Sequence, residues 1–305
     1  MDLPALLVSA TLLAGLYATM SYGLALIYGV MKIVNLAHAG VMMWGAYLAF
    51  LFITAMGINP FLAPLLTVPV FFFLGILMQR YIVRRVMSAP PISSLLLLFG
   101  VWLIMQNISY LLFSGDTRAI TTKYTLSTFL VGGISISLNR LVVFCVGILA
   151  LVSLRYFLGH TYMGKAIRAT AQDGDASKLV GIDTARVMEV AFGIGTALAG
   201  LAGSLMALIF AFDPDFGRSH LLKGFCIVVL GGLESVVGVA LGSLVLAIAE
   251  ALSVFWIMPA MQDFVSFALL VTVLVVMPGG MLGVLQKFKR DDFPPAGGKG
   301  EDAPL

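Results

Sequence analysis

Long apolar runs alternate with short polar connections along most of this 305-residue chain. At a rise of 1.5 Å per residue, about 20 apolar residues cross the hydrocarbon core of a bilayer. Backbone polar groups in lipid need partners within the protein, so such runs are expected to be helices. The pattern predicts an all-α polytopic membrane protein with one domain over 1–286. Its eight or so transmembrane segments are expected in runs 5–30, 41–58, 61–83, 92–113, 141–158, 190–212, 221–256 and 264–285.

The run 221–256 is too long for one span and is interrupted by Gly231, Gly232 and Glu234. Two glycines and a carboxylate at mid-membrane depth predict a broken pair of re-entrant half-helices that enters and leaves on the same face. A looser parallel lies at 28–40, where a polar interruption is flanked by glycines. We therefore expect one or two broken helices and an internal repeat that relates the two halves of the chain.

Composition and charge narrow the class of protein further. Hydrophobic residues make up 60% of the chain and charged residues 11%, whereas soluble domains carry roughly 25% charged residues. Basic residues near the ends of membrane segments collect on the cytoplasmic side. With Lys32 set aside, this rule places twelve of them inside and leaves five outside, at Arg118, Lys123, Arg140, Arg218 and Lys223. It predicts an N-terminus on the outer side and a cytoplasmic C-terminus.

The connection 159–189, called the polar loop below, holds eight of the 33 charged residues. Within 163–179, Met163, Ile167 and Ala171 recur at four-residue steps, which predicts an amphipathic helix, and Gly181 is expected to end it. Such a helix either rests on the bilayer surface or docks in a groove of a soluble partner. Its mixed charges favour the partner, because anionic lipid selects an excess of Lys and Arg.

A second polar connection, 114–139, is expected on the outer side. Alternating residues and the pair Gly132-Gly133 predict a short β-hairpin or an amphipathic segment, which serves as an external cap or docks an external partner. The tail 287–305 is rich in Pro, Gly and charge, and it is predicted to be disordered.

Polar residues within apolar runs are the candidates for a translocation path. A charge at the centre of a membrane helix costs roughly 2.5–3.5 kcal/mol, so function is suspected wherever one is kept. The alternative role is structural bracing of the helix ends at the breaks. Small residues at four-residue steps, such as Ala199, Gly203 and Ala207, are expected to pack helices together. The path candidates are Asn35, His38, Gly231, Gly232 and Glu234.

No catalytic or metal-binding set is present in the sequence. The segment 159–166 nearly fits a phosphate-binding loop, but Ala166 replaces the hydroxyl residue that would bind Mg²⁺, and the segment follows a membrane run. Cys145 and Cys226 lie in apolar runs and are expected to be small buried hydrophobes. The sequence therefore predicts no catalytic residue, no metal, no cofactor in this chain and no nucleic-acid partner.

Four motifs together carry a family resemblance over about 13–285. They are GLALIYGVMKIVNLAHAGVMMWGAY, MGKAIRATAQDGDASKLVGID, LKGFCIVVLGGLESVVGVALGSLVLAIAE and VMPGGMLG. With them the chain resembles the LivH-type, binding-protein-dependent permeases of bacterial branched-chain amino acid ABC transporters. In the last motif Met277-Pro278-Gly279-Gly280 replaces a more common Arg-Pro-Gln/Lys-Gly run. Glu234 stands where Gly is frequent, which leaves open whether the substrate differs.

The resemblance implies an inner-membrane importer built from two permeases, two cytoplasmic ATPases that hold ATP and Mg²⁺, and a periplasmic substrate-binding protein. The second permease is expected to be a distinct paralogue. Branched-chain amino acids, other amino acids and amides such as urea remain open as substrates. The resemblance also implies that the polar loop is the segment that couples to the ATPase. The coupling residues are Gly164, Arg168, Ala169, Ala171, Asp173, Ala176, Leu179, Gly181 and Ile182.

A different class of function stays open at this point. An ion-coupled secondary transporter or channel for a small polar solute would use Lys32, Glu234 and the broken helices directly. An intramembrane enzyme is a weaker third reading, since no pair of nucleophile and base is visible.

Overall fold

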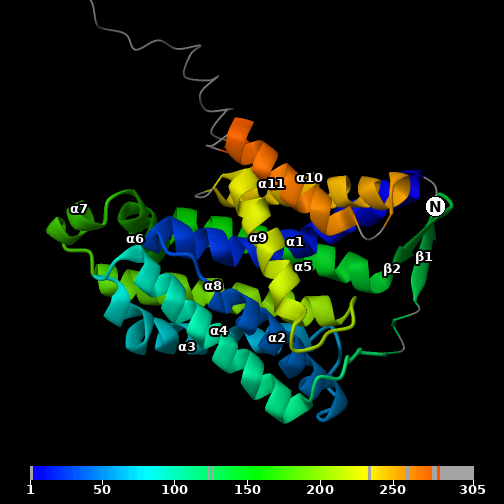
Figure 1. Ribbon diagram of the computed structural model, residues 1–305, viewed down its shortest axis with the longest axis horizontal. Helices are drawn as coiled ribbons and strands as arrows, with labels where there is room; N and C mark the ends of the chain where they lie inside the picture. The colour runs from blue at the N-terminus through cyan, green and yellow to red at the C-terminus, as the bar shows by residue number, and fades with distance from the viewer. Residues whose placement is uncertain are drawn as a thin grey trace, which may run out of the picture.

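A computed structural model shows an α-helical bundle with one small β-hairpin (Figure 1). It describes residues 3–122, 124–125, 127–232, 235–258, 261–276 and 280–281. The tail 287–305, predicted to be disordered, lies outside the described residues. The elements are α1 Leu3–Met31, α2 Ala37–Thr54, α3 Ala63–Tyr81, the 3₁₀ helix η1 Val83–Val86, α4 Pro91–Phe113, β1 Thr128–Val131, β2 Ile134–Ser137, α5 Leu138–His160, α6 Tyr162–Gln172, α7 Gly174–Leu179, α8 Thr184–Ala207, α9 Phe216–Gly231, α10 Val236–Trp256 and α11 Gln262–Val276.

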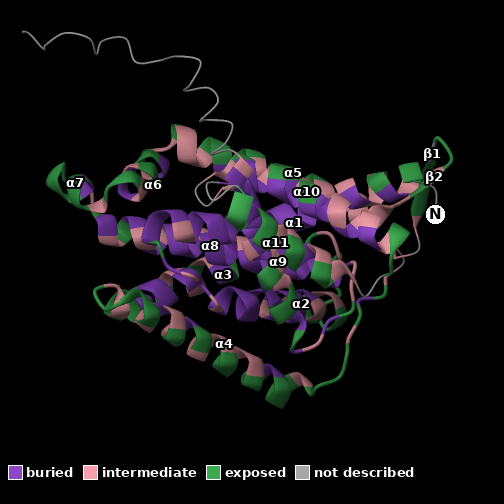
Figure 2. Ribbon diagram, turned by 45° about the horizontal axis from the view of Figure 1, so that its top comes forward, coloured by how far each residue is buried: buried purple, intermediate pink, exposed green. Residues whose placement is uncertain are grey.

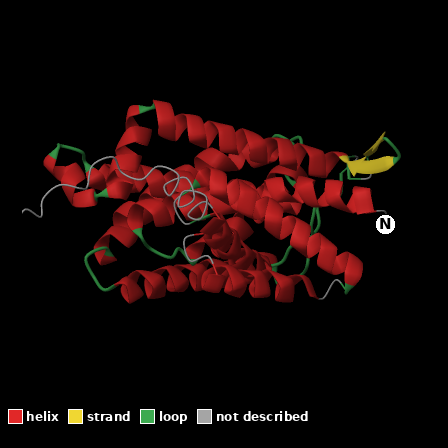
Figure 3. Cartoon of the chain, turned by 90° about the horizontal axis from the view of Figure 1, so that it is seen from above, coloured by secondary structure: helices red, strands yellow, loops and turns green. Residues whose placement is uncertain are grey.

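The bundle has two distinct ends, which Figures 1 and 3 show at opposite sides of the molecule. The hairpin β1–β2 and the start of α1 lie at one end, called the hairpin end. The short helices α6 and α7 lie at the other, called the polar-loop end. Helix α5 begins directly after β2 and leads into α6, so it crosses the bundle from the hairpin end to the polar-loop end.

Seven described helices are long and apolar enough to cross a membrane: α1, α2, α3 with η1, α4, α5, α8 and α10. The all-α polytopic fold is thereby confirmed, and the run 221–256 divides into α9 and α10. The last predicted run, 264–285, overlaps the shorter apolar helix α11, which begins two residues earlier. Part of the remainder of that run, 277–279 and 282–285, lies outside the described residues.

Helix α8 forms the centre of the bundle. In its most apolar stretch 83% of the residues are buried, against 11% in the peripheral helix α4 (Figure 2). Its small residues let neighbouring backbones approach: a Cβ on Gly203 would overlap the carbonyl oxygen of Met42, and a Cβ on Gly45 would overlap that of Gly200. The predicted packing role of this small-residue face is confirmed. The packed partners of α8, namely α1, α2 and α3, belong to the same chain.

The predicted break at 230–235 is present. Helix α9 ends at Gly231, Gly232 has a φ of +98°, and the Ser235 hydroxyl accepts a hydrogen bond of 3.1 Å from the Gly238 N–H at the start of α10. Of the two expected half-helices only α9, with 16 residues, is short; α10 has 21 and is long enough to span. The capped start of α10 and its mostly apolar sequence, in which Glu250 is the one charged residue, explain its length.

The first polar interruption also separates two helices. Residues 32–36 are not helical, Lys32 has a φ of +55°, and α2 begins at Ala37. Because His38 lies against Met20 and Gly23, α2 starts beside the middle of α1. Both interruptions thus precede a helix that can span the membrane. The internal repeat stays a prediction.

The connection 114–139 contains the predicted β-hairpin. Thr128 pairs with Ser137 and Val131 with Ile134 in antiparallel register. Gly132 and Gly133 have φ values of +57° and +83°, the positive values that a two-residue hairpin turn requires.

Two side-chain placements correct the sequence analysis. Lys223, counted there among the external cations, lies in α9, and its side chain is nearly buried. The charge count assigned each cation to a connection between apolar runs. It could not place a charged side chain inside the bundle, because the partner of that side chain comes from a distant helix. Cys145 is exposed rather than buried, since α5 lies at the bundle surface; Cys226 is buried as expected.

The packing of α8 predicts a sharp difference between two glycines. Gly203→Val should lower the melting temperature of the purified protein in detergent, because overpacking costs about 1–3 kcal/mol or more. Gly100 on α4 is the matched control, since a Cβ there meets nothing within 4 Å. Gly100→Ala should leave the melting temperature unchanged or raise it slightly. Equal melting of the two variants would contradict the central role of α8.

Candidate functional site

The polar loop folds into two short helices instead of the one predicted over 163–179. Helix α6 begins at a cap, where the Thr161 hydroxyl accepts a hydrogen bond of 2.9 Å from the Gly164 N–H. Gly164 itself is buried, and a Cβ there would overlap the Phe157 carbonyl oxygen of α5. Its position seats α6 on α5, so Gly164 lies outside any exposed docking surface.

Asp173 is the reason that the helix divides. Its carboxylate accepts hydrogen bonds from the N–H groups of Asp175, at 3.0 Å, and Ala176, at 2.9 Å, and thereby caps α7. An Asp in this capping conformation ends one helix and starts the next. On α7 the Lys178 ammonium lies 2.8 Å from Asp175, and this pair lowers the pKa of the Asp175 carboxyl.

Gly181 ends α7, as predicted. Its φ is +83°, its N–H donates to the Lys178 carbonyl at 3.1 Å, and the Ile182 N–H donates to the Ser177 carbonyl at 3.0 Å. These two bonds form a Schellman motif, in which glycine takes the left-handed position at low cost. The geometry of this end therefore depends on residue 181.

Five of the nine predicted coupling residues are exposed at the polar-loop end. Leu179 is 89% exposed and its neighbour Val180 is 77% exposed. Two adjacent apolar side chains at the tip of a charged segment favour contact with a partner. Of the other predicted residues, Arg168, Asp173, Ala176 and Gly181 are exposed, whereas Ala169, Ala171 and Ile182 are half-buried.

An ion pair ties α3 to the start of α8 next to this surface. The Arg80 guanidinium donates to both oxygens of Glu189, at 3.0 and 2.7 Å. Such a bidentate pair is geometrically specific as well as strong. It borders a groove of about 680 Å³ that Arg84, Asp183 and Arg186 also line. The first two turns of α8 are thus held to α3 at the point where α7 joins α8.

Asn35 and His38 lie in the packed interior, outside the described cavities. His38 is fully buried, and its Nε2 lies 2.9 Å from the Met20 carbonyl oxygen. Because a carbonyl only accepts, Nε2 carries the proton. His38 Nδ1 and Asn35 Oδ1 are buried without a hydrogen-bond partner among the described residues. Their assignment to a translocation path stays a prediction.

Gly231 and Gly232 have a structural reason to be glycine. A Cβ on Gly231 would overlap the backbone of Gly238 across the turn from α9 to α10, and Gly232 has a positive φ. Both residues therefore allow the sharp turn between α9 and α10. Glu234, the third candidate of this group, lies outside the described residues.

The structure contains a charge cluster that the sequence analysis did not assemble. Glu250 of α10 is buried and accepts hydrogen bonds from the Tyr17 hydroxyl, at 2.6 Å, and the Ser266 hydroxyl, at 2.5 Å. The Lys223 ammonium lies 3.0 Å from Glu250 and 3.3 Å from Asp263. Four helices, α1, α9, α10 and α11, meet at this cluster.

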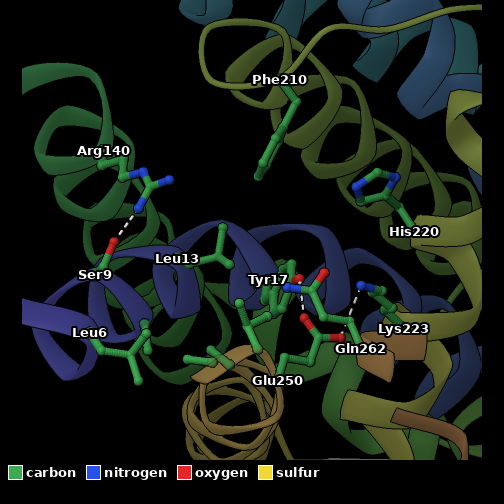
Figure 4. Close-up of a pocket in the computed structure, with 14 residues that line it drawn as sticks. Leu6, Ser9, Leu13, Tyr17, Arg140, Phe210, His220, Lys223, Glu250 and Gln262 are labelled. Atoms are coloured by element: carbon green, nitrogen blue, oxygen red, sulfur yellow. Dashed lines mark hydrogen bonds and ion pairs between the residues drawn. The ribbon is translucent and has the colours of Figure 1, made fainter. Parts of the chain in front are cut away.

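The cluster forms the floor of a cavity of about 300 Å³, shown in Figure 4. The cavity extends from Leu6, Ser9 and Arg140, at the hairpin end, to Tyr17 near the middle of α1. Arg140 donates a hydrogen bond to the Ser9 hydroxyl at its mouth. The wall is completed by Ala10, Leu13, Phe210, His220, Ala247, Ala251, Val254 and Gln262.

One signal in the sequence could have suggested this cluster. Lys223 and Glu250 lie within the apolar run 221–256, and an isolated charge of either sign is costly there. Two residues of opposite charge within one apolar run are therefore expected to form an ion pair. The sequence does not predict the direction of α9 relative to its neighbours. That direction determines which carboxylates Lys223 meets. Among the described residues, no group of three or more His, Cys, Asp or Glu is placed to hold a metal ion.

Comparison with known proteins decides the family. Residues 6–274 match the model of the family described as "Branched-chain amino acid transport system / permease component". This chain belongs to that family. The high-affinity branched-chain amino acid permease protein LivH of Salmonella typhimurium is 33% identical over 89% of this chain and 92% of its own length. BraD of Pseudomonas aeruginosa is 30% identical over 91% and 94%. No solved structure matches the chain.

Membership of the branched-chain amino acid permease family confirms the resemblance drawn from the four motifs. A relative named as a probable LivH occurs in Methanocaldococcus jannaschii, at 24% identity over 93% of this chain. With its seven apolar helices, the chain is a multi-pass membrane permease subunit of the ABC type. The comparisons do not favour the ion-coupled transporter or channel.

The charge cluster of this family member makes a prediction about stability. Lys223→Met leaves Glu250 buried without its cation, which typically costs about 3–5 kcal/mol. The melting temperature in detergent should therefore fall sharply. The double variant Lys223→Met, Glu250→Gln should recover a large part of that loss.

Asp263→Asn is the control, because the Asp263 side chain is 64% exposed. Its effect on the melting temperature should be small. Strictly additive losses in the double variant would show that Lys223 and Glu250 act independently.

Proposed function

We propose that this chain is half of the translocation path of an ATP-driven importer of branched-chain or related amino acids. Its partners are a second, distinct permease, two cytoplasmic ATP-binding subunits and a periplasmic substrate-binding protein, within the bacterial inner membrane. The chain holds no catalytic residue in this proposal, since ATP and Mg²⁺ bind to the ATPase partners.

One observation carries the proposal beyond family membership: the polar loop exposes Leu179 and Val180 beside a well-formed cap network. The two caps, at Asp173 and Gly181, define both ends of α7. A pre-formed helix with exposed apolar side chains is suited to a groove on a soluble partner, because little conformational entropy is lost on docking.

The connections of α7 suggest how movement of the ATPase reaches the membrane. Asp183 caps α8 only a few residues after α7 ends, and its carboxylate accepts a hydrogen bond of 3.1 Å from the Arg186 N–H. The ion pair between Arg80 and Glu189 then links α8 to α3. A push on α7 is thus delivered to α8, the helix around which α1, α2 and α3 pack.

The distribution of cations supports an orientation. Arg80, Arg84, Arg85, Arg155 and the basic residues of the polar loop gather at the polar-loop end. This excess is typical of the cytoplasmic side. The hairpin and the N-terminus are then periplasmic, where the hairpin is available to cap the permease or to contact the binding protein.

Gly181→Arg is expected to abolish amino-acid uptake and the co-purification of the ATPase, while the permease stays in the membrane. The left-handed conformation costs an L-residue roughly 1–2 kcal/mol, and the bulky side chain stands on the docking surface. Gly181→Asn, which tolerates this conformation, should retain much of the uptake.

Gly133 offers a matched control at the opposite end, because it also has a φ of +83° and open space around it. Gly133→Arg should leave ATPase co-purification unchanged. Normal uptake by Gly181→Arg would refute coupling through α7.

The orientation is tested by labelling single cysteines after Cys145→Ser and Cys226→Ala. Leu179→Cys should react with a membrane-impermeant maleimide only in inside-out vesicles, and Ser135→Cys, on the hairpin, only in intact spheroplasts. Both positions are exposed in the structure. The reverse pattern would invert the topology and end the proposed docking on a cytoplasmic ATPase.

A further inference from the structure

We propose that the cavity between α1, α5, α9 and α10 is a transit binding site for a zwitterionic α-amino acid with an aliphatic side chain. The inference rests on the proposed import function. It goes further by assigning a position in the permease where the substrate pauses and the groups that recognise it.

The charges of the cavity are separated along its length. At the mouth, the Arg140 guanidinium donates to the Ser9 hydroxyl and pairs with no carboxylate among the described residues. At the floor, the Lys223 ammonium pairs with Glu250, which lines the cavity, and also with Asp263, which lies beyond the lining. The mouth therefore has an unpaired positive charge, and the cluster at the other end has two carboxylates for one ammonium.

A zwitterion complements this arrangement when its carboxylate faces Arg140 and its ammonium faces Glu250. A simple anion would be repelled by the floor, and a simple cation by the mouth. Ser9 and Tyr17 are eight residues apart, about 12 Å along the helix. An α-amino acid with a hydrogen bond of about 2.9 Å at each end spans less than that length. Binding therefore requires the Arg140 guanidinium to leave Ser9 and turn toward the floor.

Unused hydrogen-bonding capacity remains at the floor. Glu250 accepts from Tyr17, Ser266 and Lys223, while a carboxylate offers about four lone-pair sites. His220 Nδ1 lies 2.9 Å from the Phe216 carbonyl oxygen, so it must donate. The neutral ring then presents Nε2 as an acceptor. These two acceptors suit an ammonium group.

The rest of the wall suits an aliphatic side chain. Leu6, Leu13 and Val254 line it, together with the ring of Phe210 and three alanines. Ligand sites commonly have volumes of about 300–1,000 Å³ and mostly apolar linings with a few placed polar groups. At about 300 Å³, this cavity has room for one small molecule.

Protection of a cysteine placed in the cavity tests the site directly. The permease carries Cys145→Ser, Cys226→Ala and Ala251→Cys, and the transporter complex is purified without ATP or binding protein. The rate at which a small maleimide labels the new cysteine is then measured. A transit site must bind weakly enough to release its ligand. For a Kd on the order of 1 mM, about 10 mM L-leucine should slow labelling about tenfold.

Two analogues separate the two contacts. At equal concentration, 4-methylpentanoate, which lacks the ammonium, and 3-methylbutylamine, which lacks the carboxylate, should protect little. Arg140→Gln should remove protection by L-leucine, and Arg140→Lys should keep part of it. Arg155→Gln, on the same helix but far from the cavity, is the control and should keep full protection.

Uptake by proteoliposomes with ATP and binding protein is measured alongside. Leucine import without protection of Ala251→Cys, or equal protection by both analogues, overturns this site and leaves the proposed function standing. Absence of branched-chain amino acid import by the intact complex overturns the proposed function instead.

Discussion

The close packing of α8 is the constraint on which the rest of the structure depends. In a bilayer no hydrophobic force draws helices together, so they associate where small residues let backbones approach. Gly203 provides that approach to α2, Gly200 makes room for Phe71 of α3, and Gly195 provides the approach to α1. The same helix begins at Asp183, next to the exposed α7. The most buried helix of the bundle therefore directly follows the exposed α7.

The second constraint is the cost of a charge away from water. Lys223, Glu250 and Tyr17 come from three helices and satisfy one another within the bundle. The cluster fixes where the oblique α9 crosses α1. The cluster also places charged groups at the floor of a largely apolar cavity. Charged groups are costly within a membrane domain, so their presence there points to a polar ligand.

Local signals in the sequence were sufficient for much of this fold. Apolar runs located the spans, Gly231-Gly232 located the break, Gly132-Gly133 the hairpin turn and Gly181 the end of the polar-loop helices. Each of these depends on conformational preferences within a few residues. The division of that segment at Asp173 was missed, because an aspartate in a helical pattern is equally compatible with an exposed face.

Contacts between distant residues could not be predicted in the same way. Tyr17 and Glu250 are 233 positions apart, and Arg80 and Glu189 are 109 apart. Their meeting depends on the crossing of whole helices, which hydropathy does not encode. Lys223 was therefore counted among external cations, and the contact of His38 with the Met20 carbonyl oxygen of α1 was not foreseen.

The Arg80–Glu189 pair has a consequence for how the bundle deforms. It joins two antiparallel helices close to where α7 leads into α8, and the Thr67 and Ser204 hydroxyls, 3.0 Å apart, join the same helices near their other ends. Held at both ends, α3 and α8 would resist sliding past each other and would move as one rigid pair. A displacement at the start of α8 would then reach the far end of α3 with little loss.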